Sequence, residues 1–510
     1  MRIIIKRYLT TKEKTATVLL LFANVVLLLT LWLDHTYDQI SFDQLLFQMK
    51  STSKGVNPDL LNNAVLYVGL FSMIITIIEG WIYHLITEKQ SIRNCSLFRR
   101  RLCSDSHVSL LIRKHVLSIV SVVLAVSLLI CGTNTRVFAF MKVDAMKSEF
   151  IRHNYVKPDQ ALLSFPEQKR NLIYIFLESM ESTYADSSSG GTITDCVIPE
   201  LVSLAEHNLN FSHNTGLGGA LSYPGTTWTA AAMVAQTAGV PVKVSLGADA
   251  YGAAGSFLPG VVSIGQILKE QGYTQVLLLG SDAEFHGREA YFTEHGDYEI
   301  IDTCSLKEAG RLPEDYEAWW GFEDEKLFSY AREELTRLAE AGEPFNFTML
   351  TADTHFPDGC QCSLCRNDFA NQYANVLACS SRQVAGFISW IQEQPFYDNT
   401  TVVISGDHLT MDAGFMEEIN PQFTRTVYNC FINAAETPAR EKNRRFGTFD
   451  LFPTTLAALG VRIDGDRLAL GTNLFSDQET LTERFGYDYL SEELQKQSEF
   501  YDSELLRVKD

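Results

Sequence analysis

Four residues whose side chains can bind a metal ion or transfer a proton follow apolar stretches of the chain. Glu178 follows one such stretch, His355 closely follows another, and Asp407 and His408 lie side by side after a third. A carboxylate beside an imidazole can bind one divalent cation, and a second carboxylate with a hydroxyl oxygen would complete four ligands. An oxygen-rich set of this kind favours Mn²⁺ or Mg²⁺, with Zn²⁺ as an alternative. A solvated turn is the structural alternative for the Asp-His pair alone.

Thr226 is the candidate nucleophile. It lies in the segment Tyr223-Pro-Gly-Thr-Thr-Trp-Thr229, just before the alanine-rich run 230–236. Pro and Gly predict a turn, the alanines predict a helix, and a threonine between them suits an N-cap. The free N–H groups and the positive dipole end of a helix stabilise a phosphate, so a hydroxyl there could attack phosphorus. Thr227 is the alternative nucleophile, and a plain structural cap is the alternative role.

The elements that must position these groups form an α/β pattern. Alternating strands and helices of this kind predict a largely parallel sheet flanked by helices. Polar groups follow each predicted strand, and ligands bind at the carboxyl ends of strands in an open parallel sheet, so the separate segments should meet at one edge. The predicted strands cover 171–177, 274–279, 345–350 and 401–404, and the predicted helices cover 261–271, 324–341 and 382–392.

The first third of the chain predicts a membrane domain. Its three apolar runs, at about 15–33, 64–86 and 115–132, have roughly the 17 to 25 residues that a bilayer-spanning helix needs. A cleaved signal peptide is the alternative for the first run, but no small-residue cleavage site follows it. Glu79 lies beside Trp81 near the end of the second run, which favours an interfacial position without a functional role.

Loop charges predict the orientation of these spans. Basic residues precede the first span and fill the loop between the second and third, so both segments should be cytoplasmic. The loop 34–63 and everything after the third span should then face outward. The formal net charge is −20 and the basic residues gather in the cytoplasmic segments, which excludes nucleic acid as a partner of the acidic outer domain.

The outer part of the chain has a cysteine group at Cys360, Cys362, Cys365 and Cys379. Such spacing is compatible with disulfides or with a zinc site. Disulfides are favoured because an extracytoplasmic compartment is oxidising and no second CxxC pair lies nearby. The spacing leaves their pairing open.

Four motifs, taken together and in this order, resemble the sulfatase-like branch of the alkaline phosphatase superfamily. The closest similarity is to membrane phosphoglycerol transferases that modify periplasmic glucans, and a more distant one is to lipoteichoic acid synthases. The resemblance covers about residues 39–476 and implies an alkaline phosphatase-like domain after the membrane spans. The motifs are Asn171-Leu-Ile-Tyr-Ile-Phe-Leu-Glu178-Ser, Gly225-Thr-Thr-Trp-Thr229, Asp353-Thr-His-Phe-Pro-Asp-Gly359 and Ser405-Gly-Asp-His-Leu-Thr-Met411.

The resemblance also implies roles for single residues. Thr226 would be the nucleophile, His355 would protonate a leaving oxygen or bind phosphate, and Arg288 would hold the phosphate. The Cys/Ser-x-Pro-x-Arg motif of true sulfatases is absent from the nucleophile position, which argues against sulfate ester hydrolysis. One divalent metal ion, Mn²⁺ first and Mg²⁺ or Zn²⁺ as alternatives, would be held by Glu178, Thr226, Asp407 and His408.

The activity implied is that of a membrane-anchored phosphotransferase. It would move glycerol phosphate from phosphatidylglycerol to a glycan or glycolipid through a phosphothreonine-type intermediate, at the extracytoplasmic face of a bacterial inner membrane. Alternatives are a phosphoethanolamine transferase, a sulfatase- or phosphodiesterase-type hydrolase, and a non-catalytic membrane binding protein. The implied layout is a membrane domain at 1–137, a linker at 138–170, a catalytic domain at 171–477, and a charged tail at 478–510 that is either a peripheral helix or a mobile end.

Overall fold

The chain divides into two compact units, each described here by itself. Unit 1 comprises Met1–Ile40 with Asn57–Ala139, and unit 2 comprises Ser41–Val56 with Phe140–Asp510. The computed structural model describes residues 9–38, 40–50, 58–87, 106–244, 251, 256–316, 318–417 and 419–507.

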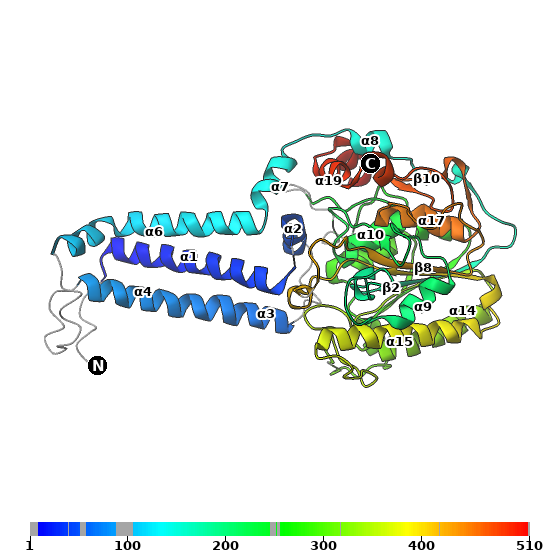
Figure 1. The fold of residues 1–510 in the computed structure, drawn as a ribbon, viewed down its shortest axis with the longest axis horizontal. Helices are drawn as coiled ribbons and strands as arrows, with labels where there is room; N and C mark the ends of the chain where they lie inside the picture. Colours follow the sequence, from blue (N-terminus) through cyan, green and yellow to red (C-terminus); the bar gives the residue numbers. More distant parts are fainter. Residues whose placement is uncertain are drawn as a thin grey trace. The chain divides into compact units, whose positions relative to one another are not determined.

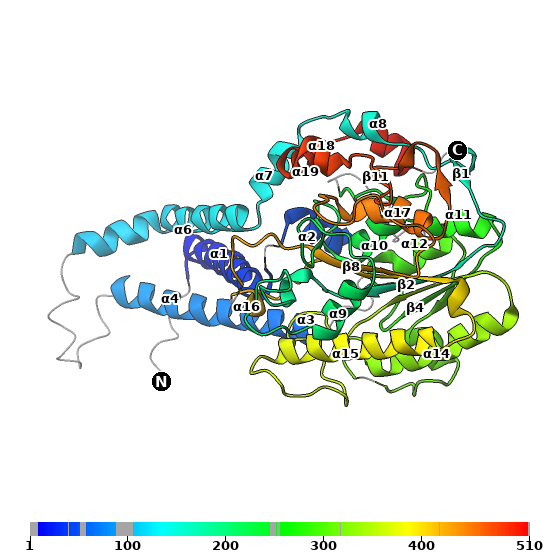
Figure 2. The ribbon, with the colours of Figure 1, turned by 45° about the vertical axis from the view of Figure 1, so that its right-hand side comes forward.

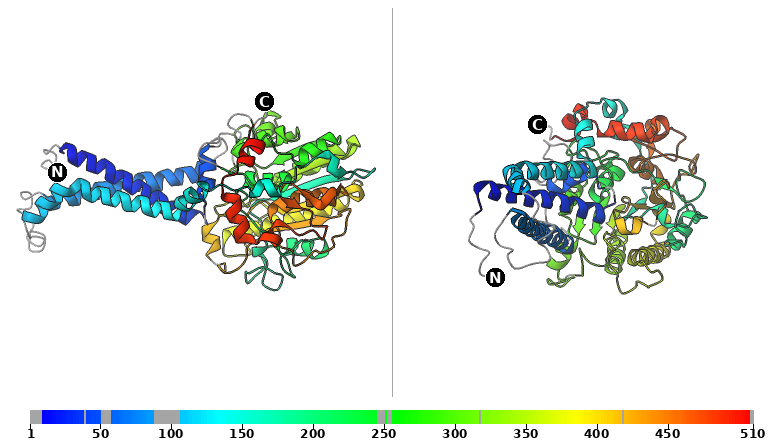
Figure 3. Two further views of the ribbon diagram at one scale, coloured as in Figure 1. Left: turned by 90° about the horizontal axis from the view of Figure 1, so that it is seen from above. Right: turned by 60° about the vertical axis from the view of Figure 1, so that its left-hand side comes forward.

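Unit 1 is built from three long helices that run side by side (Figure 3). All three are long and apolar enough to cross a membrane, as the sequence predicts. The first is α1 (Thr11–Thr36). The second, Leu60–Thr87, runs from α3 (Pro58–Ala64) through a π-helical turn at Val65–Leu70 into α4 (Phe71–Thr87). The third, Leu110–Asn134, lies within α6 (Ser106–Asn134).

Glu79 lies inside this bundle, which corrects the expected interfacial position. The amide of Asn24, near the middle of α1, donates to Glu79 Oε2 at 2.8 Å and to Thr76 Oγ1 at 3.0 Å. A polar group that faces a neighbouring helix in this way is satisfied without water, so Glu79 joins α1 to α4.

Unit 2 contains a seven-stranded sheet in the order β3-β8-β7-β2-β6-β4-β5 (Figure 1). The five strands from β7 to β5 pair in parallel, whereas β8 is antiparallel to β7 and β3 is antiparallel to β8. The largely parallel sheet is therefore confirmed, with an antiparallel edge that the sequence did not indicate. The strands are β2 (Asn171–Leu177), β3 (Gly219–Ala220), β4 (Thr274–Leu279), β5 (Glu299–Ile301), β6 (Phe345–Leu350), β7 (Thr400–Gly406) and β8 (Val427–Ile432).

Strand register brings the carboxyl ends of the central strands level. Leu177 pairs with Gly406, Phe176 pairs with Leu350, and Leu350 pairs with Leu279. The residues that follow β2, β6 and β7 therefore emerge at one edge of the sheet, as expected for ligand-binding segments of an α/β domain.

Helices cover both faces of the sheet (Figure 2). One helix layer consists of α9 (Pro199–His207), α14 (Asp324–Ala341) and α15 (Gln372–Gln392). The main apolar core lies between this layer and the sheet, where side chains of β2, β4, β6 and β7 pack against the three helices. The opposite layer contains α10 (Thr229–Ala238), α11 (Ile264–Glu270), α12 (Arg288–Glu294) and α17 (Leu451–Ala458).

A short helix from the loop between the first two spans belongs to unit 2. This helix, α2 (Phe42–Lys50), places Phe47 in a fully buried position. The Phe47 ring lies 5.1 Å from that of Trp228, 5.6 Å from that of Tyr251 and 5.3 Å from that of His286. The loop and the large domain thus share one core.

The charged tail is helical where the structure describes it, which confirms the first of its two predicted alternatives. The hydroxyl of Tyr487 donates to the carbonyl of Ser222 at 3.1 Å, and Thr482 lies 2.8 Å from the hydroxyl of Tyr223. The tail therefore buttresses the turn that leads into α10. Its elements are α18 (Leu481–Phe485), α19 (Tyr487–Gln495) and a π-helical turn at Tyr501–Leu505.

The remaining elements are short. They comprise α7 (Val137–Asp144), α8 (Phe150–Asn154), α13 (Thr303–Glu308), α16 (Ala413–Met416), the pair β1 (Leu163–Ser164) with β9 (Arg462–Ile463), and the pair β10 (Arg467–Leu468) with β11 (Gly471–Thr472).

Candidate active site

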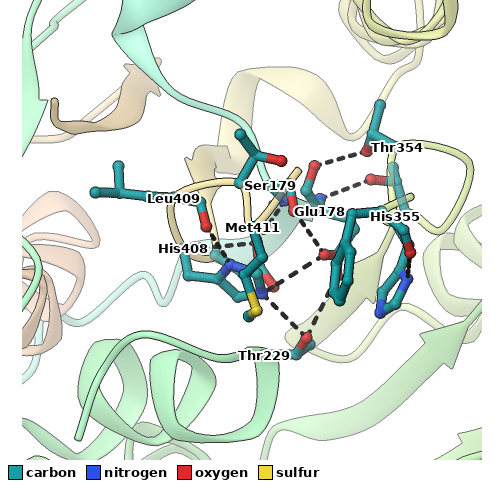
Figure 4. Close-up of polar contacts among 12 residues, drawn as sticks. Glu178, Ser179, Thr229, Thr354, His355, His408, Leu409 and Met411 are labelled. Carbon is teal, nitrogen blue, oxygen red and sulfur yellow. Dashed lines mark hydrogen bonds and ion pairs between the residues drawn. The ribbon is translucent and has the colours of Figure 1, made fainter. Parts of the chain in front are cut away.

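Glu178, Asp407 and His408 meet at the carboxyl edge of the sheet and form a buried cluster (Figure 4). His408 Nε2 lies 3.5 Å from Glu178 Oε1 and 3.3 Å from Asp407 Oδ2. One ligand atom from each of the three residues lies within 4.8 Å of the others. The structure therefore brings together the three residues that the sequence predicts as metal ligands.

Backbone groups hold the cluster rigidly. Asp407 Oδ1 accepts hydrogen bonds from the backbone N–H groups of Ser179 and His408, both at 2.7 Å. Ser179 has φ 55°, a left-handed conformation that costs free energy in a residue other than glycine. Gly406 has no room for a side chain, because a Cβ there would lie 1.9 Å from the carbonyl oxygen of Met180. The ends of β2 and β7 are thus joined closely enough for their carboxylates to share one ligand.

The donor set fits a divalent cation. The Nδ1 of His408 lies 2.8 Å from the carbonyl oxygen of Leu409, which can only accept, so this nitrogen carries the proton and Nε2 presents its lone pair to the cluster. Asp407 Oδ2 is buried without a hydrogen-bond partner. A lone pair facing two buried carboxylates is repulsive unless a positive charge lies between them.

Burial and neighbouring carboxylates shift the pKa values of Glu178 and His408. Burial raises the pKa of Glu178, and the neighbouring Asp407 carboxylate raises it further. Burial lowers the pKa of His408, but the carboxylates of Asp407 and Glu178 outweigh burial and raise it overall. Both pKa values are thus raised by neighbouring carboxylates, and a bound cation would neutralise that negative charge.

Thr229, and not Thr226, is the threonine at this cluster. Thr229 Oγ1 lies 3.3 Å from His408 Nε2 and 3.4 Å from Glu178 Oε2 (Figure 4). The Thr226 hydroxyl is instead buried in the preceding turn, where it donates to the Tyr223 carbonyl and accepts from the Tyr223 N–H, both at 2.9 Å. The structure therefore brings Thr229, three residues after the predicted Thr226, to the cluster.

The start of α10 explains this correction. The helix begins at Thr229, with Trp228 as its N-cap residue and no side-chain cap. Gln236, seven residues and about two turns later, lies on the same helix face as Thr229. Its amide donates to the carbonyl oxygens of Gly406 and Asp407 at 2.9 and 3.1 Å. These bonds fix α10 against the end of β7 and direct its amino terminus at the cluster.

Arg288 lies beside the cluster, as the sequence predicts for a phosphate-binding residue. Its guanidinium is buried and donates to Ser281 Oγ at 3.0 Å and to the Asp282 carbonyl at 2.6 Å, while its Nη1 has no hydrogen-bond partner. Burial lowers the pKa of Arg288 to about 10, although the carboxylates of Glu178 and Asp282 oppose this shift. A buried, charged donor without an acceptor suits an anionic ligand.

His355 and Arg288 both lie against Trp320. The rings of His355 and Trp320 are 4.2 Å apart, and the Arg288 guanidinium lies 5.6 Å from the Trp320 ring. His355 Nδ1 lies 2.7 Å from the Phe356 carbonyl oxygen, so the proton is on Nδ1 and Nε2 is free to accept. Burial lowers the pKa of His355, which keeps the ring neutral and favours a proton acceptor over the expected proton donor.

Neither His286 nor Trp320 was selected from the sequence. His286 is buried, its Nδ1 has no hydrogen-bond partner, and its ring stacks on Phe285 at 3.8 Å. Burial lowers its pKa to about 3, and the positive charges of Arg288, His355 and His408 lower it further. Only its place beside Arg288 in the sequence could have marked it as part of the site.

The expected disulfides are absent among the described cysteines, all of which are free. Cys362 Sγ lies 3.8 Å from Cys365 Sγ and 3.7 Å from Cys379 Sγ, which is too far for an S–S bond. The preference for disulfides in this group is therefore wrong for this structure.

Comparison with known proteins agrees with the fold. A family model described as sulfatase matches residues 170–461. The chain therefore belongs to the sulfatase family. It is 32% identical over 332 residues to phosphoglycerol transferase I of Escherichia coli O139:H28, and 33% identical over 330 residues to phosphoglycerol transferase I of Salmonella choleraesuis. These matches cover 64% and 63% of this chain but 41% of each relative.

Solved structures with a related fold include a lipoteichoic acid synthase and a phosphoethanolamine transferase. Lipoteichoic acid synthase LtaP from Listeria monocytogenes is 18% identical with a TM-score of 0.49, covering 64% of this chain and 80% of that one. Lipooligosaccharide phosphoethanolamine transferase A from Neisseria meningitidis is 14% identical with a TM-score of 0.48, covering 90% of this chain and 87% of that one.

Proposed function

We propose that this protein is a metal-dependent phosphotransferase that moves glycerol phosphate from phosphatidylglycerol to a glycan or glycolipid hydroxyl. The observation that supports this most directly is Thr229, whose hydroxyl lies within 3.4 Å of both Glu178 and His408 at the amino terminus of a helix. A hydroxyl held against two prospective metal ligands suits a nucleophile that takes up a phosphoryl group.

Glu178, Asp407 and His408 would hold one divalent cation, Mn²⁺ first and Mg²⁺ or Zn²⁺ as alternatives. When bound, such an ion supplies positive charge that favours the deprotonated Thr229 oxygen. The N–H groups of the first turn of α10 have no partners within the helix, so they can donate to phosphate oxygens. The unpartnered Nη1 of Arg288 can do the same.

The proposed reaction has two displacements at phosphorus. The Thr229 oxygen attacks the phosphodiester of phosphatidylglycerol, the bond from phosphorus to the diacylglycerol oxygen breaks, and that oxygen takes a proton. An acceptor hydroxyl then attacks the glycerophosphoryl threonine, loses its proton and releases Thr229. Because each step inverts phosphorus, the overall reaction retains its configuration.

His355 is placed for the second displacement. Its Nε2 carries a lone pair, and its lowered pKa leaves it neutral near pH 7, so it can accept the proton of the acceptor hydroxyl. The adjacent buried Trp320 ring packs against the His355 ring and can fix its orientation. This assigns His355 to the acceptor and Arg288 to the donor phosphate.

Unit 1 supports a lipid donor. Three helices capable of crossing a membrane precede the domain, and a soluble substrate would not require such an anchor. The α2 segment lies in sequence between the first two of these helices and packs in the core of unit 2. The chain therefore connects unit 2 to the apolar helices at more than one point.

The test is to follow the donor. Purified full-length protein with Mn²⁺ receives phosphatidylglycerol labelled in the terminal glycerol, first without and then with an oligosaccharide acceptor. We expect diacylglycerol release and a glycerol phosphate adduct on the peptide that contains Thr229, followed by transfer of the label to the sugar. Phosphatidylethanolamine labelled in its headgroup, used in its place, would give a phosphoethanolamine adduct on that peptide if ethanolamine is the donor headgroup. Release of free glycerol phosphate without transfer would show a hydrolase.

A further inference from the structure

A second cluster of ligand-type side chains lies outside the active site. Cys362 and Cys365 lie in the loop that follows β6 and His355, and Cys379 lies on α15. One sulfur from each lies within 4.8 Å of the others, and Cys362 and Cys379 are buried. Three thiols that converge in this way are unusual in a domain without a disulfide among its described cysteines.

The sulfur separations match those of a metal-thiolate site. Zinc–sulfur bonds of about 2.3 Å in a tetrahedral arrangement place neighbouring sulfurs about 3.8 Å apart. The observed distances from Cys362 Sγ are 3.8 Å to Cys365 and 3.7 Å to Cys379. A disulfide would draw only two of the three together and leave the third thiol buried beside them.

From this geometry we infer that Cys362, Cys365 and Cys379 bind one zinc ion, a site separate from the Glu178, Asp407 and His408 cluster. The Cys-x-x-Cys spacing of the first two is typical of structural zinc sites, and thiolate ligands select zinc over magnesium or manganese. Cys360, half-buried and two residues before Cys362, is the ligand-type residue nearest in sequence for the fourth position.

The surroundings suit thiolate ligands. The side-chain amide of Gln383, one turn after Cys379, lies 3.5 Å from Cys379 Sγ and 3.7 Å from Cys362 Sγ. Amide donors to sulfur orient metal-bound thiolates and stabilise their charge. Arg382 adds a positive charge on the same turn of α15.

The consequence of the zinc site is mechanical. It joins the loop that leaves β6 to the side of α15, and that loop begins with the residues that place His355 against Trp320. We therefore assign the zinc a structural role, with the acceptor side of the active site as the part that it supports.

Metal analysis tests the assignment on the full-length protein, purified in detergent without reductant. Wild-type protein should contain about one more zinc ion per chain than Cys379→Ser. Cys430→Ser, which removes a buried thiol in β8, should retain the zinc. Equal zinc in wild type and Cys379→Ser, or iron or copper in its place, would overturn the inference.

Two measurements on wild type decide the matter even if Cys379→Ser does not fold. Cobalt exchanged into the protein should give a thiolate-to-metal charge-transfer band in the near ultraviolet, which the carboxylate and imidazole cluster cannot produce. After denaturation with chelator and without reductant, Cys362, Cys365 and Cys379 should all react with a thiol reagent. If any pair reacts only after reduction, a disulfide occupies this position and the zinc site does not exist.

Discussion

At the scale of single residues, Thr226 and Thr229 have the same side chain and different surroundings. We predict that Thr229→Ala lowers the rate of transfer by about 10³-fold or more, because the nucleophile is lost while the other cluster residues remain. Thr226→Ala should instead cost about 1–2 kcal/mol of stability, because it removes a buried turn hydrogen bond. Turnover and thermal unfolding of both variants separate the roles, and a catalytic loss confined to Thr226→Ala would return the nucleophile to the turn.

The buried imidazole of His286 makes stability depend on pH. Its pKa is about 3 in the folded protein, chiefly because of burial, against about 6.5 in the unfolded chain. Below pH 6.5 the unfolded chain therefore binds more protons, and stability falls as pH falls toward 3. We predict that this residue alone costs about 2 kcal/mol between pH 7 and pH 5.

The measurement for His286 is thermal unfolding of the purified protein at pH 7 and pH 5. His286→Gln should lose less stability over this interval than wild type, whereas His207→Gln, which changes an exposed histidine, should follow wild type. An unchanged pH dependence in His286→Gln would mean that this ring is protonated or solvated in the folded protein.

Sequence reasoning selected Glu178, Asp407 and His408, which the structure brings together, because they follow apolar strands at the edge of the sheet. It selected Thr226 instead of Thr229, the threonine at this cluster, because Pro224 and Gly225 define the turn, whereas α10 begins only at Thr229, next to the alanine run. The residue next to that run, Thr229, was the better indication. His286 and Trp320 left no such trace, because their position depends on how the chain folds back after β4.

At the scale of elements, α2 is predicted to stabilise the domain into which it packs. Phe47 is fully buried against Trp228, Tyr251 and His286, so Phe47→Ala should cost about 3–5 kcal/mol. Trp228 directly precedes Thr229, so turnover should fall as well. Met49→Ala is the matched control, since this side chain on the same helix is 83% exposed.

Unfolding midpoints and turnover of the two α2 variants check this prediction. Equal midpoints for Phe47→Ala and wild type would mean that α2 does not pack in the domain in solution. If stability falls and turnover does not, α2 supports the fold without positioning Thr229.

The central strands were predictable because strands buried on both faces are continuous apolar runs. The first half of α15 was missed, since the prediction began at 382 and the helix begins at Gln372. Several of its early residues, such as Ala374, Asn375 and Ser381, are small or polar yet buried, and burial of such residues depends on the neighbouring helix α9. The antiparallel β8 and the helix α2 were also missed, because both depend on contacts between residues far apart in sequence.

At the scale of the whole molecule, unit 2 constrains the topology of the chain. The segment 41–56 lies between the first and second apolar helices, and 140–510 follows the third, yet the two segments form one compact unit. Both must therefore lie on the same side of any membrane that the three helices cross. With three crossings, residues 1–10 then lie on the opposite side.

We predict that unit 2 faces outward, because the loop between the second and third helices is rich in arginine and such loops remain cytoplasmic. In intact spheroplasts, a membrane-impermeant thiol reagent should label a cysteine introduced at exposed Met49 of α2 but not one introduced at Lys12 near the amino terminus. Both should react after the membrane is permeabilised, which controls for access. Labelling at Lys12 alone would mean that the orientation is inverted, and unit 2 would then have no access to a donor lipid in the outer leaflet. Labelling of both positions before permeabilisation would mean that the three helices do not all cross the membrane, and the anchoring argument for a lipid donor would fail with them.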